Sequence, residues 1–545
     1  VDPVAAVVRV TVDITATNRR PETVTHRFYF DRAFLAVQPG TAGFRVTGPT
    51  RPTVRVSARA TTHTTLRIDF GERLTSGRTT TFRLTFDIPD PGGEPDREIR
   101  VGDSLVAFPV WAFASEGASG SPVEVVFPHG YEVTFETGEL DGPEPSAEGG
   151  DRYWSGPLAA PLAFFSYLVA TREGEVTEST LIVPVGGVDA EIRLRAWADD
   201  PAWAERVGAL FRDGLPVLAE SIGLPWPRTT PLVVSQTLSR SAGGQAGRYD
   251  PAAGPMEVAY WAPSGILLAE AAHTWFNGAL LADRWASEGF ATWYALQAAE
   301  ALGVEAEPPA LDEEIEAARV PLNAWTADAA DPAAEAYGYA ASYSLVERIV
   351  ERAGEDALRA AWTRVAAGTA AYPDPARPTE VPAADGPPDW RTLLDHLEES
   401  SGASLADLWL AWVVRPDEAG QLTARAAARE SLVRTEALAG DWALPPQARE
   451  ALRAWQFDAA EQILADARTV IAQRGAVEAA AEAAGLELPG GIREPFERGD
   501  VVGASAIAAT QFSAIRVLAG AGAFRPVDPD ALTVIGLLGE DPDAD

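Results

Sequence analysis

The residues with the clearest chemical potential lie in one short run, Ala269-Glu270-Ala271-Ala272-His273. Residues four positions apart share one face of a helix. A zinc site built on a helix uses two histidines at that spacing, and a glutamate after the first takes a proton from the metal-bound water. Here the glutamate (Glu270) and the second histidine (His273) are present, but Ala269 occupies the position of the first histidine. A methyl group cannot bind a metal ion.

A second run, WASEGFA, follows this segment and places Glu288 on the expected next helix. Together with the TWFNG that follows His273, the two runs resemble the aminopeptidase N family of gluzincins, whose pattern is HExxH-x-W-F-G-N and then W-L-N-E-G-F-A. The resemblance implies zinc-dependent cleavage of peptides. It also implies that Glu270 is the general base and that His273 and Glu288 are the second and third zinc ligands.

The same resemblance suggests two further site residues, a catalytic tyrosine and a substrate-binding glutamate. The family uses a tyrosine that hydrogen-bonds the oxyanion of the tetrahedral intermediate, and Tyr339 fits that position best, with Tyr337 as the alternative. The family also holds the free amino group of its substrate with a glutamate in a G-A-M-E-N strand. Glu257 in GPMEV resembles that glutamate, but it lies closer to Ala269 than the family spacing requires. The segment GGQAGRY, from Gly243, is the other candidate for this strand and contains no acid.

The loss of one ligand decides the expected function. His273 and Glu288 are one ligand short of the three that hold a catalytic zinc, so we expect zinc, the cofactor of the family, to be absent or weakly bound. We therefore expect a degenerate, inactive or impaired homologue that retains a peptide-binding cleft. One alternative is an active zinc-dependent aminopeptidase with an unrecognised third ligand. Another is a structural or interaction protein of the bacterial envelope.

The elements around these motifs predict a multidomain chain. Residues 1–195 contain strands with alternating polar and apolar residues, separated by turns, which predicts an all-β sandwich region with one or two subdomains. Residues 196–415 mix strands with helices, including expected helices at 264–278, 284–302 and 333–353, and predict an α+β domain. The resemblance makes this domain thermolysin-like. Residues 416–545 are rich in helix formers and predict an α-helical bundle or short solenoid.

Composition limits the partners. The 545 residues carry a formal net charge of −35 and contain no cysteine. Such an acidic chain repels phosphate backbones and anionic lipid, so we expect no nucleic-acid partner, and without cysteine no disulfide or thiolate chemistry is available. We expect a peptide or protein ligand in the cleft and an extracellular or cell-envelope location in a bacterium. We also expect a signal segment upstream of Val1 and a possible membrane anchor outside the given sequence.

Overall fold

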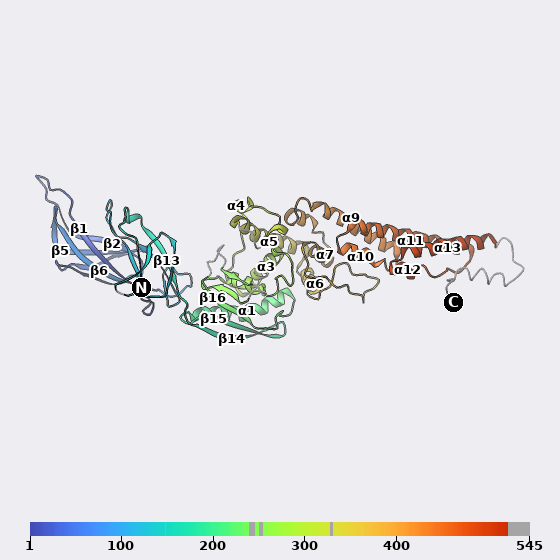
Figure 1. The fold of residues 1–545 in the computed structure, drawn as a ribbon, viewed down its shortest axis with the longest axis horizontal. Helices are drawn as coiled ribbons and strands as arrows, with labels where there is room; N and C mark the ends of the chain where they lie inside the picture. Colours follow the sequence, from blue (N-terminus) through green and yellow to red (C-terminus); the bar gives the residue numbers. More distant parts are fainter. Residues whose placement is uncertain (148, 239–245, 250–253, 327–330, 522–545) are drawn as a thin grey trace.

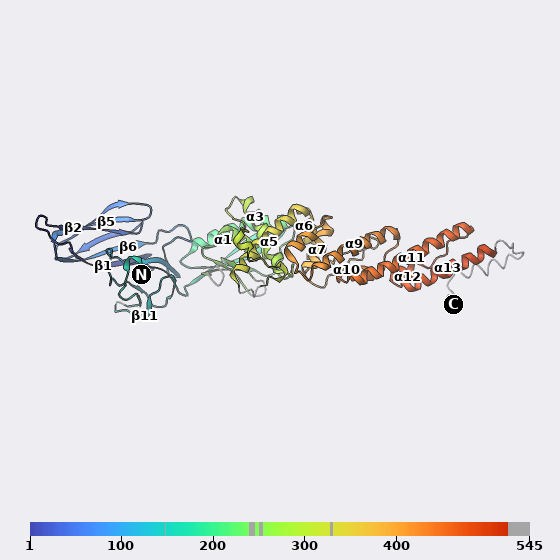
Figure 2. The same cartoon turned by 90° about the horizontal axis from the view of Figure 1, so that it is seen from above.

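The computed structural model describes residues 1–147, 149–238, 246–249, 254–326 and 331–521. The protein is elongated: strands occupy one end, a mixed region lies in the middle, and helices form the other end (Figure 1). The view from above gives the same order (Figure 2). Three separate clusters of buried apolar residues accompany these three parts, so each part is stabilised mainly by its own core.

The first strands form two three-stranded antiparallel sheets, β1-β6-β3 and β2-β5-β4. Their alternating sequences turn one face inward, and Leu66 of β5 and Leu84 of β6 are fully buried in one core. Two sheets that face a common core in this way form a sandwich. The strands are β1 (Val7–Thr17), β2 (Tyr29–Val37), β3 (Ala42–Thr47), β4 (Thr53–Arg59), β5 (Thr64–Thr75) and β6 (Thr79–Pro89).

The next strands form two smaller antiparallel sheets, β10-β13-β8-β7 and β11-β12-β9. Phe108 and Leu168 from the first of these sheets and Phe127 from the second belong to the same buried cluster as the residues of the first two sheets. The strands are β7 (Arg100–Val101), β8 (Leu105–Trp111), β9 (Glu124–Phe127), β10 (Glu132–Thr137), β11 (Asp141–Pro145), β12 (Asp151–Trp154) and β13 (Phe165–Thr171), with a short 3-10 helix η1 (Pro161–Ala163).

The middle part contains a five-stranded mixed sheet in the order β14-β15-β16-β18-β17. The predicted N-terminal β region, residues 1–195, includes β14 and most of β15, but β15 pairs in parallel with β16, and Val183 and Ile192 lie in the middle core. Alternation identifies a strand without showing which sheet it joins. The strands are β14 (Val176–Val185), β15 (Val188–Trp197), β16 (Leu232–Thr237), β17 (Gly247–Arg248) and β18 (Met256–Ala259).

Helices complete the middle core, and α1 packs against β14, α2 and α3. Two of the expected helices have nearly the predicted bounds, at 284–302 and 332–353, but the first ends at residue 272 rather than 278. The helices are α1 (Pro201–Ile222), α2 (Ser264–Ala272), α3 (Arg284–Leu302), α4 (Glu313–Glu316), η2 (Leu322–Ala324), α5 (Pro332–Ala353), α6 (Glu355–Ala366), α7 (Trp390–Ser401), α8 (Ala406–Leu408) and the π-helical turn η3 (Trp409–Val413).

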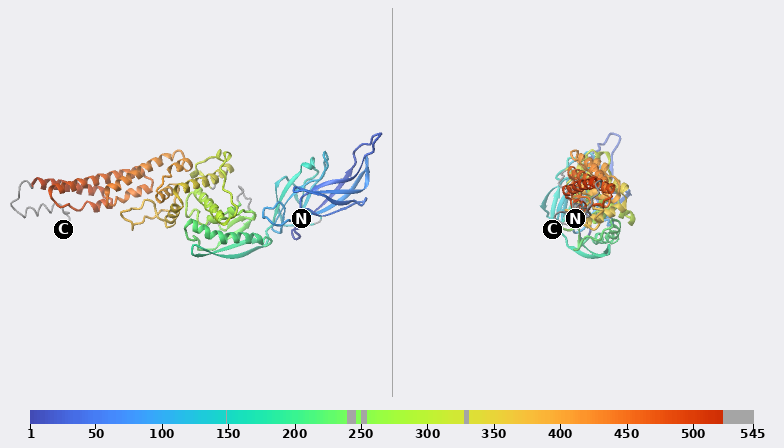
Figure 3. Two further views of the ribbon diagram at one scale, coloured as in Figure 1. Left: turned by 180° about the vertical axis from the view of Figure 1, so that it is seen from behind. Right: turned by 90° about the vertical axis from the view of Figure 1, so that its right-hand side faces the viewer.

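The remaining described helices form the far end of the molecule, where α11 lies beside both α9 and α13 (Figure 3). They share a third core, which is built largely of alanine with Leu464, Val470 and Phe496. Residues 501–520 of α13 are long and apolar enough to cross a membrane by length and composition alone. The helices are α9 (Ala419–Ala439), α10 (Pro446–Arg453), α11 (Phe457–Ala484), α12 (Arg493–Arg498) and α13 (Val501–Ala521).

Candidate functional site

The site is built on the contact between α2 and α3. The backbone N–H of His273 donates to the carbonyl of Ala269 at 3.0 Å, so these two residues lie one above the other on the same helix face. Small residues pack at this contact: Ala271 and Ala272 of α2 are fully buried. Gly289 of α3 is also small and buried, but it faces Ser342 and Val346 of α5. The methyl group of Ala269 is partly buried and packs against the middle core.

His273 and Glu288 are in direct contact. Nε2 of the imidazole lies 3.2 Å from Oε2 of the carboxylate. The other ring nitrogen, Nδ1, donates to the backbone carbonyl of Phe276 at 2.8 Å. Burial alone would lower the pKa of His273, but the carboxylate of Glu288 raises it to about 9. Burial would likewise raise the pKa of Glu288, and the imidazole overcomes this effect and lowers it.

Glu270 lies on α2, about one turn before His273, and its side chain is under the edge of the sheet. Its carboxylate accepts a hydrogen bond from the backbone N–H of Tyr249. Its Oε2 is buried and has no hydrogen-bond partner among the described residues. Burial raises the pKa of Glu270 to about 7; the charge of His273 opposes this rise, while the charge of Glu288 adds to it. The site therefore contains a carboxyl group whose ionised form is poorly solvated.

The strand that covers Glu270 is β17, at the edge of the sheet. A Cβ atom on Gly247 would lie 2.5 Å from Cγ of Glu270, so any larger residue at this crossing would have to displace the Glu270 side chain. The covering strand comes from the segment GGQAGRY, of which residues 246–249 are described and 243–245 lie outside the described residues. This segment is one of the two candidates, with GPMEV, that the sequence offers for the strand beside the site.

Tyr339 reaches the site through Arg284, a residue that sequence analysis missed. Arg284 donates to the hydroxyl of Tyr339 at 3.1 Å, and its Nε lies 3.9 Å from Oε1 of Glu288. It also makes two hydrogen bonds to the carboxylate of Glu335, at 2.8 and 2.9 Å, and stacks over the ring of Trp325 at 4.0 Å. The available signal was its position four residues before Glu288, one helical turn away.

The two tyrosine candidates have different surroundings. Burial and the charge of Glu288 raise the pKa of Tyr339, so it remains a neutral hydroxyl group near neutral pH. Tyr337 is fully buried in the middle core, and its hydroxyl has no hydrogen-bond partner among the described residues. Arg284 therefore links the Tyr339 hydroxyl to Glu288, whereas Tyr337 packs in the core.

Glu257 is not brought to these residues. It lies on β18 opposite Arg248 of β17 and is exposed. Its neighbours Met256 and Val258 are fully buried in the middle core. Alternation along a strand therefore turns the Glu257 side chain to the opposite face of the sheet, and no contact joins it to the site within the described part of the chain.

The donor set does not fit a catalytic zinc ion. The described residues contain no group of three or more His, Cys, Asp or Glu side chains that could hold a metal. His273 and Glu288 converge, but the third position on their shared face is the methyl group of Ala269. Beside the pair, Oε2 of Glu270 is buried without a partner among the described residues, and the Tyr339 hydroxyl accepts a hydrogen bond from Arg284.

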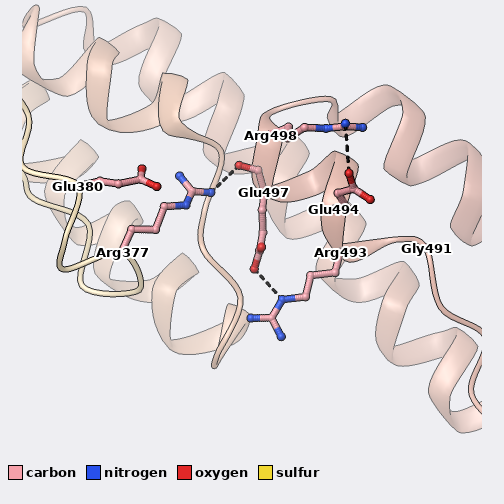
Figure 4. A pocket seen from close by; sticks show the side chains of 7 residues that line it. All are labelled: Arg377, Glu380, Gly491, Arg493, Glu494, Glu497 and Arg498. Atoms are coloured by element: carbon pink, nitrogen blue, oxygen red, sulfur yellow. Dashed lines mark hydrogen bonds and ion pairs between the residues drawn. The ribbon is translucent and has the colours of Figure 1, made fainter.

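A separate concave region of about 590 Å³ lies between α12 and the connection from α6 to α7 (Figure 4). Its charged side chains are largely paired: Arg493 binds Glu497 at 2.8 Å, and Arg498 binds Glu494 at 3.3 Å. This pairing leaves little net charge for a ligand, and none of the predicted site residues takes part. The lining residues are Arg377, Glu380, Gly491, Arg493, Glu494, Glu497 and Arg498.

Comparisons with known proteins give distant structural matches. No protein-family profile and no curated protein sequence matches the chain. Among solved structures, it is similar to the M1 zinc metallopeptidase from Deinococcus radiodurans, with 18% identity over 76% of this chain and 92% of that one and a TM-score of 0.33. A point mutant of that enzyme bound to a Tyr-Ser-Ala substrate gives 19% identity over 76% and 92% of the two chains, with a TM-score of 0.31. Similarity at this level assigns neither a family nor an activity.

Proposed function

We propose that this protein is a metallopeptidase-like homologue that binds peptides beside α2 and α3 without hydrolysing them through a metal. The observation that carries the proposal is the direct contact of 3.2 Å between His273 and Glu288, with Ala269 as the third residue on their face. Each of the two ligand-type side chains has the other as its partner. The position from which an imidazole would complete a tetrahedral site holds a methyl group instead.

The peptide-binding part of the proposal rests on groups that remain available. Among the described strands, β17 pairs only with β18, so its outer edge can accept an extended peptide as an added strand. Glu270 lies directly beneath β17 and has a buried oxygen without a partner. We extend the proposal to an extracellular or cell-envelope location.

Metal analysis of the purified chain tests the inactive assignment. We expect no zinc to survive dialysis in the wild-type protein, and about one zinc per chain in Ala269→His, because the substitution restores a third ligand. Ala279→His adds a histidine at an exposed position just beyond α2 and should retain no zinc. One tightly bound zinc in the wild type would overturn the proposal.

Calorimetric titration with the tripeptide Tyr-Ser-Ala tests the binding function. We expect the wild type to bind the peptide in the presence of a chelator and to leave it intact. Gly247→Val places a side chain where Glu270 lies and should abolish binding, whereas Gly278→Val, at a glycine with open space around it, should not. Hydrolysis by the wild type that the chelator abolishes, or equal binding by both variants, would contradict the proposal.

A further inference from the structure

Charge is distributed unevenly along the chain. Residues 1–90 contain 13 arginines and eight acidic residues, which gives them a formal charge of +5. Because the whole chain carries −35, the remaining residues carry −40. The first β-sandwich is therefore a basic module attached to a strongly acidic body. The net charge of the whole chain conceals this basic module.

Hydrogen bonds hold together the two segments at the outer end of this module. These segments are the connection between β1 and β2 (residues 18–28) and the turn between β5 and β6 (residues 76–78), which together we call the distal tip. The buried side chain of Asn18 donates to the carbonyls of Phe28 and Leu74, at 3.1 and 2.9 Å. Its backbone bonds to Gly77 and Arg78, at 2.8 and 3.0 Å. Figures 1 and 3 show the β1–β2 connection at the end of the molecule farthest from the C-terminal helices.

The distal tip and the strand ends beside it present unpaired positive charge. Five arginines are exposed there, and none of them forms an ion pair with any described residue. Only two acidic residues, Glu22 and Glu72, lie in the same segments. The five arginines are Arg19, Arg20, Arg27, Arg73 and Arg78.

Apolar side chains are interleaved with these arginines. Val24 in the β1–β2 connection is fully exposed, and about half of Tyr29 and Phe30 is exposed at the adjacent end of β2. Arg73 lies over the ring of Tyr29 at 4.6 Å, which keeps a cation and an aromatic ring together at the surface. Exposed aliphatic and aromatic groups beside free arginines are characteristic of surfaces that enter the headgroup region of a bilayer.

We propose that the distal tip docks end-on to an anionic lipid bilayer. Its arginines contact the headgroup phosphates, and Val24, Tyr29 and Phe30 enter the boundary between headgroups and acyl chains. The acidic body does not cancel the attraction, because β6 alone, with 11 residues, spans about 36 Å and charges are screened within about 8 Å at physiological salt. The exposed aliphatic side chain of Val24 favours a bilayer over an anionic polymer, because a polymer offers no apolar phase to receive it.

Co-sedimentation of the full chain with lipid vesicles tests the proposal. We expect binding to phosphatidylcholine vesicles that contain 30% phosphatidylserine, weakening with added salt, and no binding to pure phosphatidylcholine. The variant R19S/R20S/R27S should lower the partition coefficient by about tenfold or more. The control R45S/R55S/R59S removes the same charge from exposed, unpaired positions on β3 and β4 and should bind like the wild type.

Two further results would decide against a lipid partner. An equal loss of vesicle binding in the two triple variants would show general electrostatic attraction without a docking site. Equal binding to anionic and neutral vesicles would contradict the proposal. Val24→Ser, which leaves the charge unchanged, should weaken vesicle binding but leave binding to soluble heparin unaltered. Tight heparin binding without vesicle binding would identify an anionic polymer as the partner instead. All variants should melt at the wild-type temperature, since the replaced side chains are exposed.

Discussion

Nε2 of His273 lies 3.2 Å from Oε2 of Glu288, while Nδ1 of the same ring donates to the carbonyl of Phe276. Both ring nitrogens therefore have acceptors, and the ring orientation is fixed. The pair joins the end of α2 to the first turns of α3 and stabilises, by charge and hydrogen bonding, a helix contact that a shared metal ion stabilises in a zinc site.

A double-mutant cycle should reveal this pairing. We expect His273→Ala and Glu288→Ala to show a coupling free energy of about 1–2 kcal/mol, because the pair is largely buried and charge-assisted. The exposed pair Arg319–Glu316 is the matched control and should show less than about 0.5 kcal/mol. Urea denaturation gives both values, and equal coupling in the two cycles would contradict the pairing.

Gly338 in α5 controls the position of Trp325. A Cβ atom at this glycine would overlap the indole ring, and the same ring stacks on Arg284 at 4.0 Å. We expect Gly338→Ala to destabilise the protein by about 1–3 kcal/mol through overpacking. Gly475→Ala, in the middle of α11 with open space around it, should instead stabilise it by about 0.5–1 kcal/mol. Thermal melts compare the two, and stabilisation in both variants would show that helix propensity, not the indole contact, decides the outcome.

The spacing of residues in the sequence anticipates much of the site. The bounds of α3 follow from its apolar pattern, and the motif places Glu270, His273 and Glu288 within reach of one another. Their roles in catalysis and metal binding remain predictions. Arg284 was missed because an exposed helical arginine and a partly buried one have the same local sequence, and only the chain fold shows that Glu335 and Tyr339 lie beside it.

Other features depend on contacts that local patterns do not contain. The expected helix at 264–278 ends early because the side chain of Asn277 donates to the carbonyls of His273 and Thr274, which replaces helical hydrogen bonds with a turn. The strands 176–185 and 188–197 were recognised, but their sheet was not, because pairing with β16 is a long-range contact. The close packing at Gly247 arises from the distant Glu270.

His396 should make stability depend on pH. It is buried in α7, and burial together with the nearby charge of Arg364 lowers its pKa to about 4. Its unfolded-state pKa is about 6.5, so the unfolded chain binds a proton first as the pH falls. Protonation of His396 therefore does not reduce the free energy of unfolding above pH 6.5. As the pH falls from 6.5 to 4, it reduces that free energy by up to about 3 kcal/mol.

Comparison with His396→Leu isolates this contribution from that of the carboxylates. The leucine variant lacks the titrating ring, so the difference between the two free energies of unfolding should change across pH 4–6.5 and remain constant above it. Urea titrations at pH 7.5, 5.5 and 4.5 measure that difference. A constant difference at all three values would mean that the ring titrates normally in the folded protein.

The largest stability effect should come from Arg425, which lies between α7 and α9. Its Nε lies 2.6 Å from Asp395 and its Nη1 lies 2.7 Å from Glu398, and all three side chains are buried. Arg425→Met leaves two buried carboxylates without this partner, and we expect a loss of about 3–5 kcal/mol. Arg434→Met breaks only an exposed pair with Glu430 and should cost less than about 1 kcal/mol.

Neutralising the acids tests whether unpaired charge, and not lost packing, causes this effect. The triple variant R425M/D395N/E398Q removes all three charges and should recover part of the stability lost in Arg425→Met, because amides are less costly to bury than carboxylates. Guanidinium denaturation of the two variants gives the comparison. A triple variant that is no more stable than Arg425→Met would instead assign the loss to the packing of the long arginine side chain between the two helices.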